Sequence, residues 1–201
     1  MLTPEVAIAF ITGVIGPILL IVVKNLLDRK KNKTPDMVLD ALETSKLVES
    51  KLDDIREEFN ADRVWVAQFH NGGHFYPTGK SMAKFSFIYE TVSVNANSIQ
   101  PSFQNIPVNL FSKSINALLE SDVISIYDYK DETTATYGLK YIAEENGCKS
   151  GYLFSIKTLN DKFIGILGVD YTRRKKQLSI EDINHLEVYS SSLGGVLMNE
   201  K

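Results

Sequence analysis

The segment from Gln68 to Lys80 gathers the side chains that are best suited to bind a ligand. It holds two of the chain's three histidines, together with three glycines, several aromatic rings and a lysine. Glycines let a ligand approach the backbone closely, aromatic rings offer flat stacking faces, and loops on a rigid scaffold are where binding residues concentrate. The candidate ligand-binding residues of this segment are His70, Asn71, Gly72, Gly73, His74 and Tyr76.

Two other interpretations of the same segment stay open. A metal ion would use His70 and His74 with a carboxylate, but the intervening Asn-Gly-Gly disfavours the helix that their spacing suits, so no metal is assigned. Alternatively, residues 71–73 simply turn the chain, and His70 bonds a backbone carbonyl. Further candidates for the same pocket lie outside the segment, at Tyr89, Glu90, Tyr127 and Tyr137.

The chain offers little that could catalyse a reaction. Its one cysteine, Cys148, lies near the start of a predicted strand with no sign of a histidine base beside it. Because no acid–base pair or activated nucleophile can be assembled, the sequence does not predict an enzyme, and no cofactor is assigned. The net charge is −3, and no basic face dominates the soluble part, so no nucleic-acid partner is predicted.

Residues 6–23 contain no charged side chain, and a basic segment, residues 24–33, follows them. A helix of that length spans about 27 Å, close to the thickness of a bilayer's hydrocarbon core. A cleaved signal peptide would carry its positive charge before the apolar run, and a buried core helix is the other alternative. By the positive-inside rule, residues 1–5 lie outside, residues 6–23 span the bilayer, and the chain from residue 24 onward is cytoplasmic. The sequence therefore predicts a single-pass membrane protein.

A connecting helix is predicted for residues 34–60. Thr34-Pro35-Asp36 is typical of a helix start. The apolar and small residues that follow have heptad spacing, at Val38, Ala41, Ser45, Val48, Leu52, Ile55 and Phe59. This stripe packs either on the helix's own domain or on a second copy, as a coiled-coil homodimer through residues 38–59. The two interpretations can hold along different stretches.

Residues 61–201 are predicted to form an α+β domain. Strand-forming runs are expected at residues 64–69, 84–92, 123–127, 151–159 and 162–171, and helices at residues 108–119, 137–145 and 179–198. The Asn160-Asp161 pair indicates a hairpin, and Ser179 to Asp182 forms a capping box. This order predicts a five- or six-stranded, largely antiparallel sheet with packed helices.

The penultimate segment, Lys162 to Asp170, has the Gly-x-Leu-x-Val type of strand before a capped last helix, and Ala61 to Val64 follows a long helix. In these features the chain resembles the GAF family of sensory domains, which are related to PAS domains. The resemblance implies an antiparallel sheet with the first and last helices on one face and a ligand pocket on the other. A weaker likeness, around residues 69–73, is to small proteins of tailed phages.

The resemblance does not indicate a ligand. Bilin-binding members use a placed cysteine with a companion motif, and members that reduce free methionine sulfoxide use several cysteines; neither set is present here. The Asn-Lys-Phe-Asp-Glu set of cyclic-nucleotide-binding members is not present in order. The sequence thus predicts a membrane-anchored GAF-like sensory module that binds an unidentified small molecule or protein. The alternative is a membrane-tethered structural or interaction protein with no small-molecule ligand. A phage origin is compatible with this alternative.

Overall fold

The computed structural model describes residues 4, 13, 15–31, 37–131 and 139–198, and it divides into two units, residues 1–40 and 41–200. In the first unit, α2 (Gly16–Lys31) exposes its large apolar side chains from Ile18 to Val23: Ile18 is 56% exposed and Leu20 is 71% exposed. Within the described ranges, every helix is too short or too polar to cross a bilayer. Residues 6–12 and 14 of the predicted membrane segment lie outside these ranges, and the membrane span stays a prediction.

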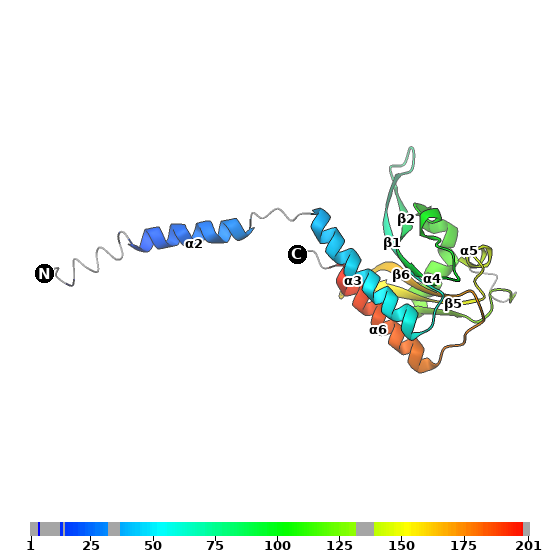
Figure 1. The fold of residues 1–201 in the computed structure, drawn as a ribbon. Helices are drawn as coiled ribbons and strands as arrows, with labels where there is room; N and C mark the ends of the chain where they lie inside the picture. The colour runs from blue at the N-terminus through cyan, green and yellow to red at the C-terminus, as the bar shows by residue number, and fades with distance from the viewer. Residues whose placement is uncertain (1–3, 5–12, 14, 32–36, 132–138, 199–201) are drawn as a thin grey trace. The chain divides into compact units, whose positions relative to one another are not determined.

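The second unit is built on one six-stranded sheet (Figure 1). Its strands are β1 (Arg63–His74), β2 (Ser81–Val92), β3 (Ile106–Pro107), β4 (Val123–Ile126), β5 (Ser150–Lys157) and β6 (Phe163–Tyr171). The strand order is β3-β2-β1-β6-β5-β4, and all neighbouring pairs are antiparallel. The predicted antiparallel α+β sheet is confirmed, with six strands. The two-residue β3 was not predicted.

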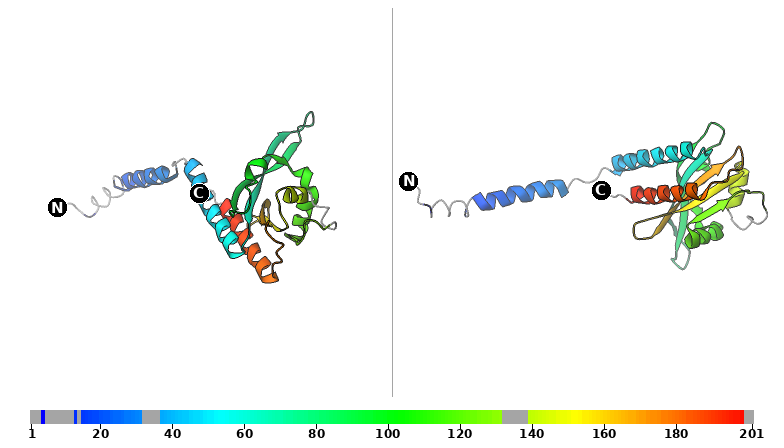
Figure 2. Two further views of the ribbon diagram at one scale, coloured as in Figure 1. Left: turned by 45° about the vertical axis from the view of Figure 1, so that its right-hand side comes forward. Right: turned by 90° about the horizontal axis from the view of Figure 1, so that it is seen from below.

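Helices cover both faces of the sheet (Figure 2). The helices are α3 (Met37–Glu58), η2 (Gln100–Ser102), η3 (Val108–Phe111), α4 (Ser112–Ser121), α5 (Leu139–Glu145) and α6 (Ile180–Leu197). α3 and α6 lie together on one face, where Leu52, Leu186 and Leu193 are fully buried. α4 and α5 lie on the other face, where Leu118 and Ala143 join the core. We call these the α3–α6 face and the α4–α5 face.

Alternation along the strands sends successive side chains to the two faces. In β1, Val64 and Val66 belong to the α3–α6 core, whereas Trp65 and Ala67 belong to the α4–α5 core. The predicted capping box of the last helix is confirmed: the Asp182 N–H donates to Ser179 Oγ at 3.1 Å, and the Ser179 N–H donates to Asp182 Oδ2 at 3.0 Å.

The apolar stripe of α3 is divided along its length. Val48, Leu52 and Ile55 are fully buried against the helix's own domain, whereas Val38 and Ala41 are exposed. The second half of the stripe therefore packs on its own domain, as one of the two interpretations predicted. The start signal at residues 34–36 lies outside the described residues.

The prediction that Asn71-Gly72-Gly73 turns the chain is wrong. β1 continues through these residues to His74, and the loop that reverses the chain is formed by residues 75–80. Gly73 has a φ of 97°, which only shifts the register between Asn71 and His74. A left-handed glycine inside a hairpin can produce a bulge in place of a turn, because the cross-strand pairing resumes beyond it.

Candidate functional site

A buried ion pair lies on the α4–α5 face, where β1 begins and β6 ends. Arg63 on β1 and Asp170 on β6 are direct cross-strand partners, so their side chains leave the sheet on the same side. The Arg63 guanidinium donates to Asp170 Oδ2 from Nε at 2.9 Å and pairs with it from Nη2 at 2.8 Å. Arg63 is 0% exposed and Asp170 is 2% exposed. Arg63 is the most deeply buried charged residue in the described part of the domain.

Two more groups complete the surroundings of Arg63. Its Nη1 donates to the backbone oxygen of Asn97 at 3.1 Å, and its Nη2 donates to Cys148 Sγ at 2.9 Å. Burial alone would lower the pKa of Arg63, but the negative charge of Asp170 raises it above its ordinary value. The guanidinium therefore stays charged inside the domain.

Trp65 connects the ion pair to an aromatic stack. Its indole Nε1 donates to Asp170 Oδ2 at 3.0 Å, and its ring stacks on Phe87 with centroids 4.1 Å apart. The indole lies flat over β6 because its cross-strand partner there is a glycine. A Cβ on Gly168 would lie 2.1 Å from the indole Cε2. The glycine of the recognised Lys162–Asp170 segment thus makes room for the tryptophan.

Tyr129 and Cys148 border the same cluster and stay uncharged. Burial, and then the charge of Asp170, raise the pKa of the Tyr129 hydroxyl well above its ordinary value. The same two causes raise the pKa of the Cys148 thiol. A buried neutral thiol is a poor nucleophile, so Cys148 is held as a packing and hydrogen-bonding group.

Glu90, one of the predicted site residues, holds the loop that closes the cluster on one side. Its carboxylate accepts hydrogen bonds from the N–H groups of Ile99 at 2.9 Å and Gln100 at 3.1 Å, and from the Ser98 hydroxyl. Its Oε1 also lies 3.9 Å from Arg63 Nε. Glu90 therefore fixes residues 97–100, including the Asn97 carbonyl that accepts from Arg63.

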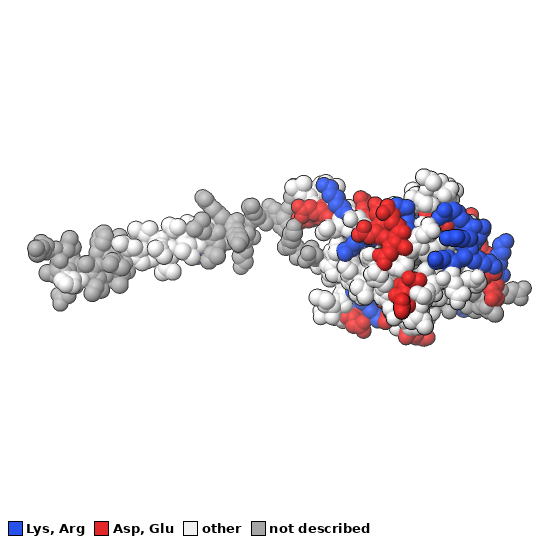
Figure 3. Space-filling view, turned by 60° about the horizontal axis from the view of Figure 1, so that its bottom comes forward, with Lys and Arg blue, Asp and Glu red and all other residues white. Residues whose placement is uncertain are grey.

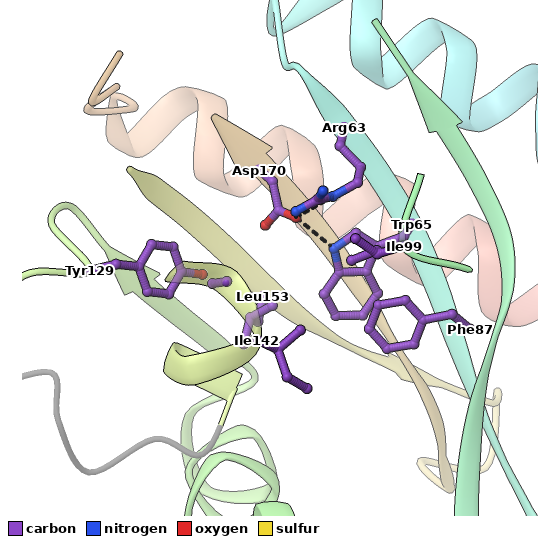
Figure 4. Close-up of a pocket in the computed structure, with 9 residues that line it drawn as sticks. Arg63, Trp65, Phe87, Ile99, Tyr129, Ile142, Leu153 and Asp170 are labelled. Atoms are coloured by element: carbon purple, nitrogen blue, oxygen red, sulfur yellow. Dashed lines mark hydrogen bonds and ion pairs between the residues drawn. The ribbon is translucent and has the colours of Figure 1, made fainter. Parts of the chain in front are cut away.

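A cavity lies beside these groups, between the sheet and α5 (Figure 4). Its total void, including the opening to solvent, is about 270 Å³, but the centre of a water molecule can reach only about 10 Å³ of it. That is room for about one water molecule. The residues that line the cavity are Arg63, Trp65, Phe87, Ile99, Tyr129, Ile142, Ala143, Leu153 and Asp170.

None of the other predicted site residues that the structure describes lines this cavity. His70 lies on β1, where its Nε2 and the Ser86 hydroxyl are 2.8 Å apart, and Tyr89 packs against the α3–α6 core. Tyr127 is 53% exposed. Asn71, Gly72, Gly73, His74 and Tyr76 lie in the β1–β2 hairpin, and Tyr137 is outside the described residues. Whether any of them binds a ligand stays a prediction.

Sequence reasoning missed Arg63, Trp65 and Asp170. The available signal was one charged residue beside apolar residues in or next to each of two predicted strands, in the runs Arg63-Val64-Trp65 and Gly168-Val169-Asp170. Opposite charges inside buried strands are rarely left unpaired. The two residues are 107 positions apart and meet through the register of β1 with β6.

Solved structures of similar fold were found, whereas no family model and no curated protein sequence matches the chain. The GAF domain of PixJ from Thermosynechococcus elongatus, in its blue-light-absorbing form, matches with a TM-score of 0.61 at 15% identity, over 81% of this chain and 89% of that one. The chain has the GAF fold. The phycoerythrobilin-bound GAF domain of a cyanobacterial phytochrome matches with a TM-score of 0.60 at 17% identity, over 78% of this chain and 86% of that one.

A third solved structure of similar fold is not named as a GAF domain. A domain of a putative two-component sensor histidine kinase protein from Sinorhizobium meliloti has a TM-score of 0.53 at 18% identity, over 77% of this chain and 91% of that one. At these identities the likeness concerns the fold. It agrees with the predicted arrangement of an antiparallel sheet with the first and last helices of the domain on one face.

Proposed function

We propose that the protein is a membrane-anchored sensory module whose GAF-fold domain lies in the cytoplasm and binds a small polar molecule on the α4–α5 face. The observation that carries the proposal is the buried Arg63–Asp170 pair beside a cavity. Apolar residues of similar volume often stabilise a core as well as a buried ion pair does. Buried titratable groups with altered pKa values beside a cavity are typical of functional sites.

The cavity offers a polar ligand both charge and hydrogen-bonding groups. Arg63 and Asp170 present opposite charges, Tyr129 presents a hydroxyl, and Trp65 and Phe87 present aromatic surface (Figure 4). Since there is room for about one water molecule, a larger ligand enters only when the cover moves. α5 is the cover that we propose to move, because it has seven residues and contributes Ile142 and Ala143 to the cavity wall.

The membrane anchor in this proposal is the uncharged run of residues 6–23. The exposed apolar side chains of α2 and the basic residues after Val23 support it. Such side chains are unfavourable in water and favourable in a bilayer. The connecting helix α3 would carry a signal between the anchor and the domain. A homodimer would use the first half of the predicted 38–59 seam, from Val38 to Ser45, since the seam residues from Val48 onward are buried.

The second candidate function is a membrane-tethered structural or interaction protein without a small-molecule ligand. The small size of the cavity favours it, together with the aromatic filling of the α4–α5 core by Trp65, Phe85, Phe87 and Phe111. In this case the Arg63–Asp170 pair would only specify the packing of the sheet. A direct search for a bound molecule separates the two candidates.

Native mass spectrometry of the full chain in detergent tests the site. The sensory proposal expects a small molecule retained by the wild-type chain and lost in Ala143→Leu, which fills the cavity from α5. Glu144→Leu adds the same side chain at the exposed neighbouring position and should keep the molecule. A chain that carries no molecule in any of the three forms would support the structural alternative. The same spectra report whether the chain is a dimer.

Membrane fractionation of cells tests the anchor. The wild-type chain should stay with the membranes after alkaline extraction, because the apolar run spans the bilayer. Leu20→Arg places a charge in that run and should release much of the chain. Leu42→Arg makes the same change at an exposed position outside the run and should not. Complete extraction of the wild-type chain would contradict the anchor.

A further inference from the structure

The β1–β2 hairpin extends past the sheet as an arm, which we define as residues 70–84. Along β1 the pairing with β6 stops at Gln68, and along β2 the pairing with β3 covers Lys84 and Phe85. Beyond those points the two strands pair with each other, from His70 opposite Lys84 to His74 opposite Ser81. Figures 1 and 2 show the arm projecting from the domain. At about 3.3 Å per strand residue, its limbs reach on the order of 20 Å.

The tip of the arm turns two aromatic rings to solvent. The loop is closed by the Phe75 N–H, which donates to the Lys80 carbonyl at 2.9 Å, and by the Gly79 N–H, which donates to the Phe75 carbonyl at 2.8 Å. Tyr76 is 97% exposed and Phe75 is 46% exposed. Neighbouring exposed aromatic side chains at the end of a hydrogen-bonded loop are typical of a contact surface.

The charged side chains of the arm are basic, and none is acidic. From Val64 to Tyr89 the sequence contains no aspartate or glutamate, whereas the arm carries Lys80 and Lys84 as well as His70 and His74. In the described part of the chain, no ion pair involves either lysine. A cationic surface with exposed aromatic rings complements an anionic interface.

The arm lies at the end of the domain where the chain enters it. α3 ends at Glu58 and β1 begins at Arg63. β1 then runs back along the domain toward the arm, so the arm and the part of α3 just after Ala41 share one end of the second unit (Figure 1). The predicted membrane segment ends at Val23, at most about 50 Å along the chain from the start of α3. The β5–β6 turn, with Leu159 fully exposed, lies at this end too.

The other basic group of the domain lies at the opposite end. Arg173 pairs with Asp62 and Lys175 pairs with Asp128, beyond the end of β6. Figure 3, in which the bottom of Figure 1 comes forward, shows basic and acidic side chains there in separate groups. Because this basic group lies at the end of the domain away from the arm, and Arg173 and Lys175 within it are already paired with acidic side chains, the arm is the better candidate for contact with a membrane.

We propose that the tip of the arm docks onto the anionic membrane surface. In this arrangement Tyr76 and Phe75 enter the headgroup region, where amphipathic rings are favoured, and Lys80 and Lys84 contact acidic headgroups. The arm would be a second attachment that holds the domain at a fixed distance and orientation. This inference rests on the proposed membrane anchor, which brings the domain within reach of the bilayer.

Tryptophan fluorescence of the full chain in nanodiscs tests the proposal. Tyr76→Trp places a reporter at the tip, Val94→Trp places one at a fully exposed position on the opposite end, and the wild-type chain supplies the background of the buried Trp65. The discs contain phosphatidylcholine with about a third phosphatidylserine, with or without brominated acyl chains. The added emission of Tyr76→Trp should fall about twofold in brominated discs, and that of Val94→Trp should not change.

The charge contribution is tested in the same experiment. Adding Lys80→Glu and Lys84→Glu to Tyr76→Trp, or omitting phosphatidylserine, should abolish most of the quenching. Equal emission of Tyr76→Trp in brominated and plain anionic discs would overturn the arm proposal and leave a protein as the arm's occupant. A wild-type chain that does not enter discs would overturn the anchor instead. In that case, brominated anionic vesicles are added to the Tyr76→Trp chain. Quenching of its added tryptophan emission would support docking of the arm, and unchanged emission would overturn the docking proposal.

Discussion

The two faces of the sheet are built from the same strands but hold very different side chains. On the α3–α6 face the core is apolar, and its buried tyrosines satisfy their hydroxyls locally: Tyr171 donates to the Phe59 carbonyl and Tyr152 to the Lys176 carbonyl, each at 3.0 Å. On the α4–α5 face the same strands bury Arg63 against Asp170. Neighbouring residues of one strand thus differ in role: Val169 packs in the apolar core of the α3–α6 face, and Asp170 pairs with Arg63 on the α4–α5 face.

This difference indicates how the domain divides stability and function. Apolar burial between α3, α6 and the sheet gives stabilisation that needs no partner from outside. A buried ion pair gives little net stability, since removing charges from water offsets their attraction. The α4–α5 face therefore retains groups that the fold does not need for stability, and binding is the function that we propose for them.

The largest expected effect comes from breaking the ion pair on the α4–α5 face. Asp170→Leu leaves the fully buried Arg63 and the Trp65 N–H without their acceptor, so the free energy of unfolding should fall by about 3–5 kcal/mol. Urea denaturation of the full chain in detergent measures it. In the double variant Arg63→Met/Asp170→Leu no charge is stranded, and the loss should be smaller than in Asp170→Leu alone. A larger loss in the double variant would show that the pair itself stabilises the fold.

The second effect is a cavity on the α3–α6 face. Leu52→Ala removes a fully buried side chain of α3 and should lower the free energy of unfolding by about 3 kcal/mol. Leu47→Ala, on the same helix at a 55% exposed position, should change it by less than about 0.5 kcal/mol. The retained small molecule should be unaffected by either variant in native mass spectra. Loss of that molecule in Leu52→Ala would contradict the proposal that ligand binding depends on the α4–α5 face alone.

A smaller effect is expected where β6 makes room for Trp65. Gly168→Ala would force the indole off β6 and away from Asp170, and should cost about 1–3 kcal/mol with a shift in tryptophan emission. Gly195→Ala, on the outer side of α6 with no atom within 4 Å of the added Cβ, should instead raise stability by about 0.5–1 kcal/mol. Unchanged emission in Gly168→Ala would contradict the packing described for Trp65.

The smallest effect is a change in the acid sensitivity of stability that comes from Asp62, the residue before β1. Burial raises the pKa of Asp62, but hydrogen bonds from the Arg173 and Thr172 N–H groups, with the Arg173 side chain, outweigh it and hold the pKa below its usual 3.8. A carboxyl whose pKa is lowered by folding adds stability above about pH 4, and this is lost as the pH falls through the lowered value. Asp62→Asn should therefore flatten the loss of stability below about pH 4. An unchanged pH profile of the urea midpoint would contradict this role, with Asp54→Asn as the exposed control.

Elements that are specified by local sequence could be predicted. The Ser179–Asp182 capping box and the apolar periodicity after it are sufficient to place α6, and the Asn160-Asp161 turn places β5 beside β6. β3 could not be predicted, because two residues carry no periodicity and form a strand only through pairing with Lys84 and Phe85. The hairpin loop was misplaced, because a glycine pair predicts a turn and a bulge equally well.

The candidate site depended on contacts that local sequence does not encode. Arg63 and Asp170 meet through the register of β1 with β6, and Cys148 reaches them from the loop after α5. The sequence instead favoured the glycine- and histidine-rich segment, whose unusual composition is visible at once. That segment forms most of the arm. Among the predicted site residues that the structure describes, Glu90 alone contacts the cluster.

Hydrogen exchange of the full chain tests the division between the faces most directly. The account predicts that amides of α5, the proposed cover of the cavity, exchange through a local opening whose free energy is well below that of global unfolding. Amides of α3 from Val48 onward and of α6 around Leu193 should exchange only through global unfolding, because their side chains fill the apolar core. Equal protection of α5 and of these helices would contradict an α4–α5 face that opens for a ligand.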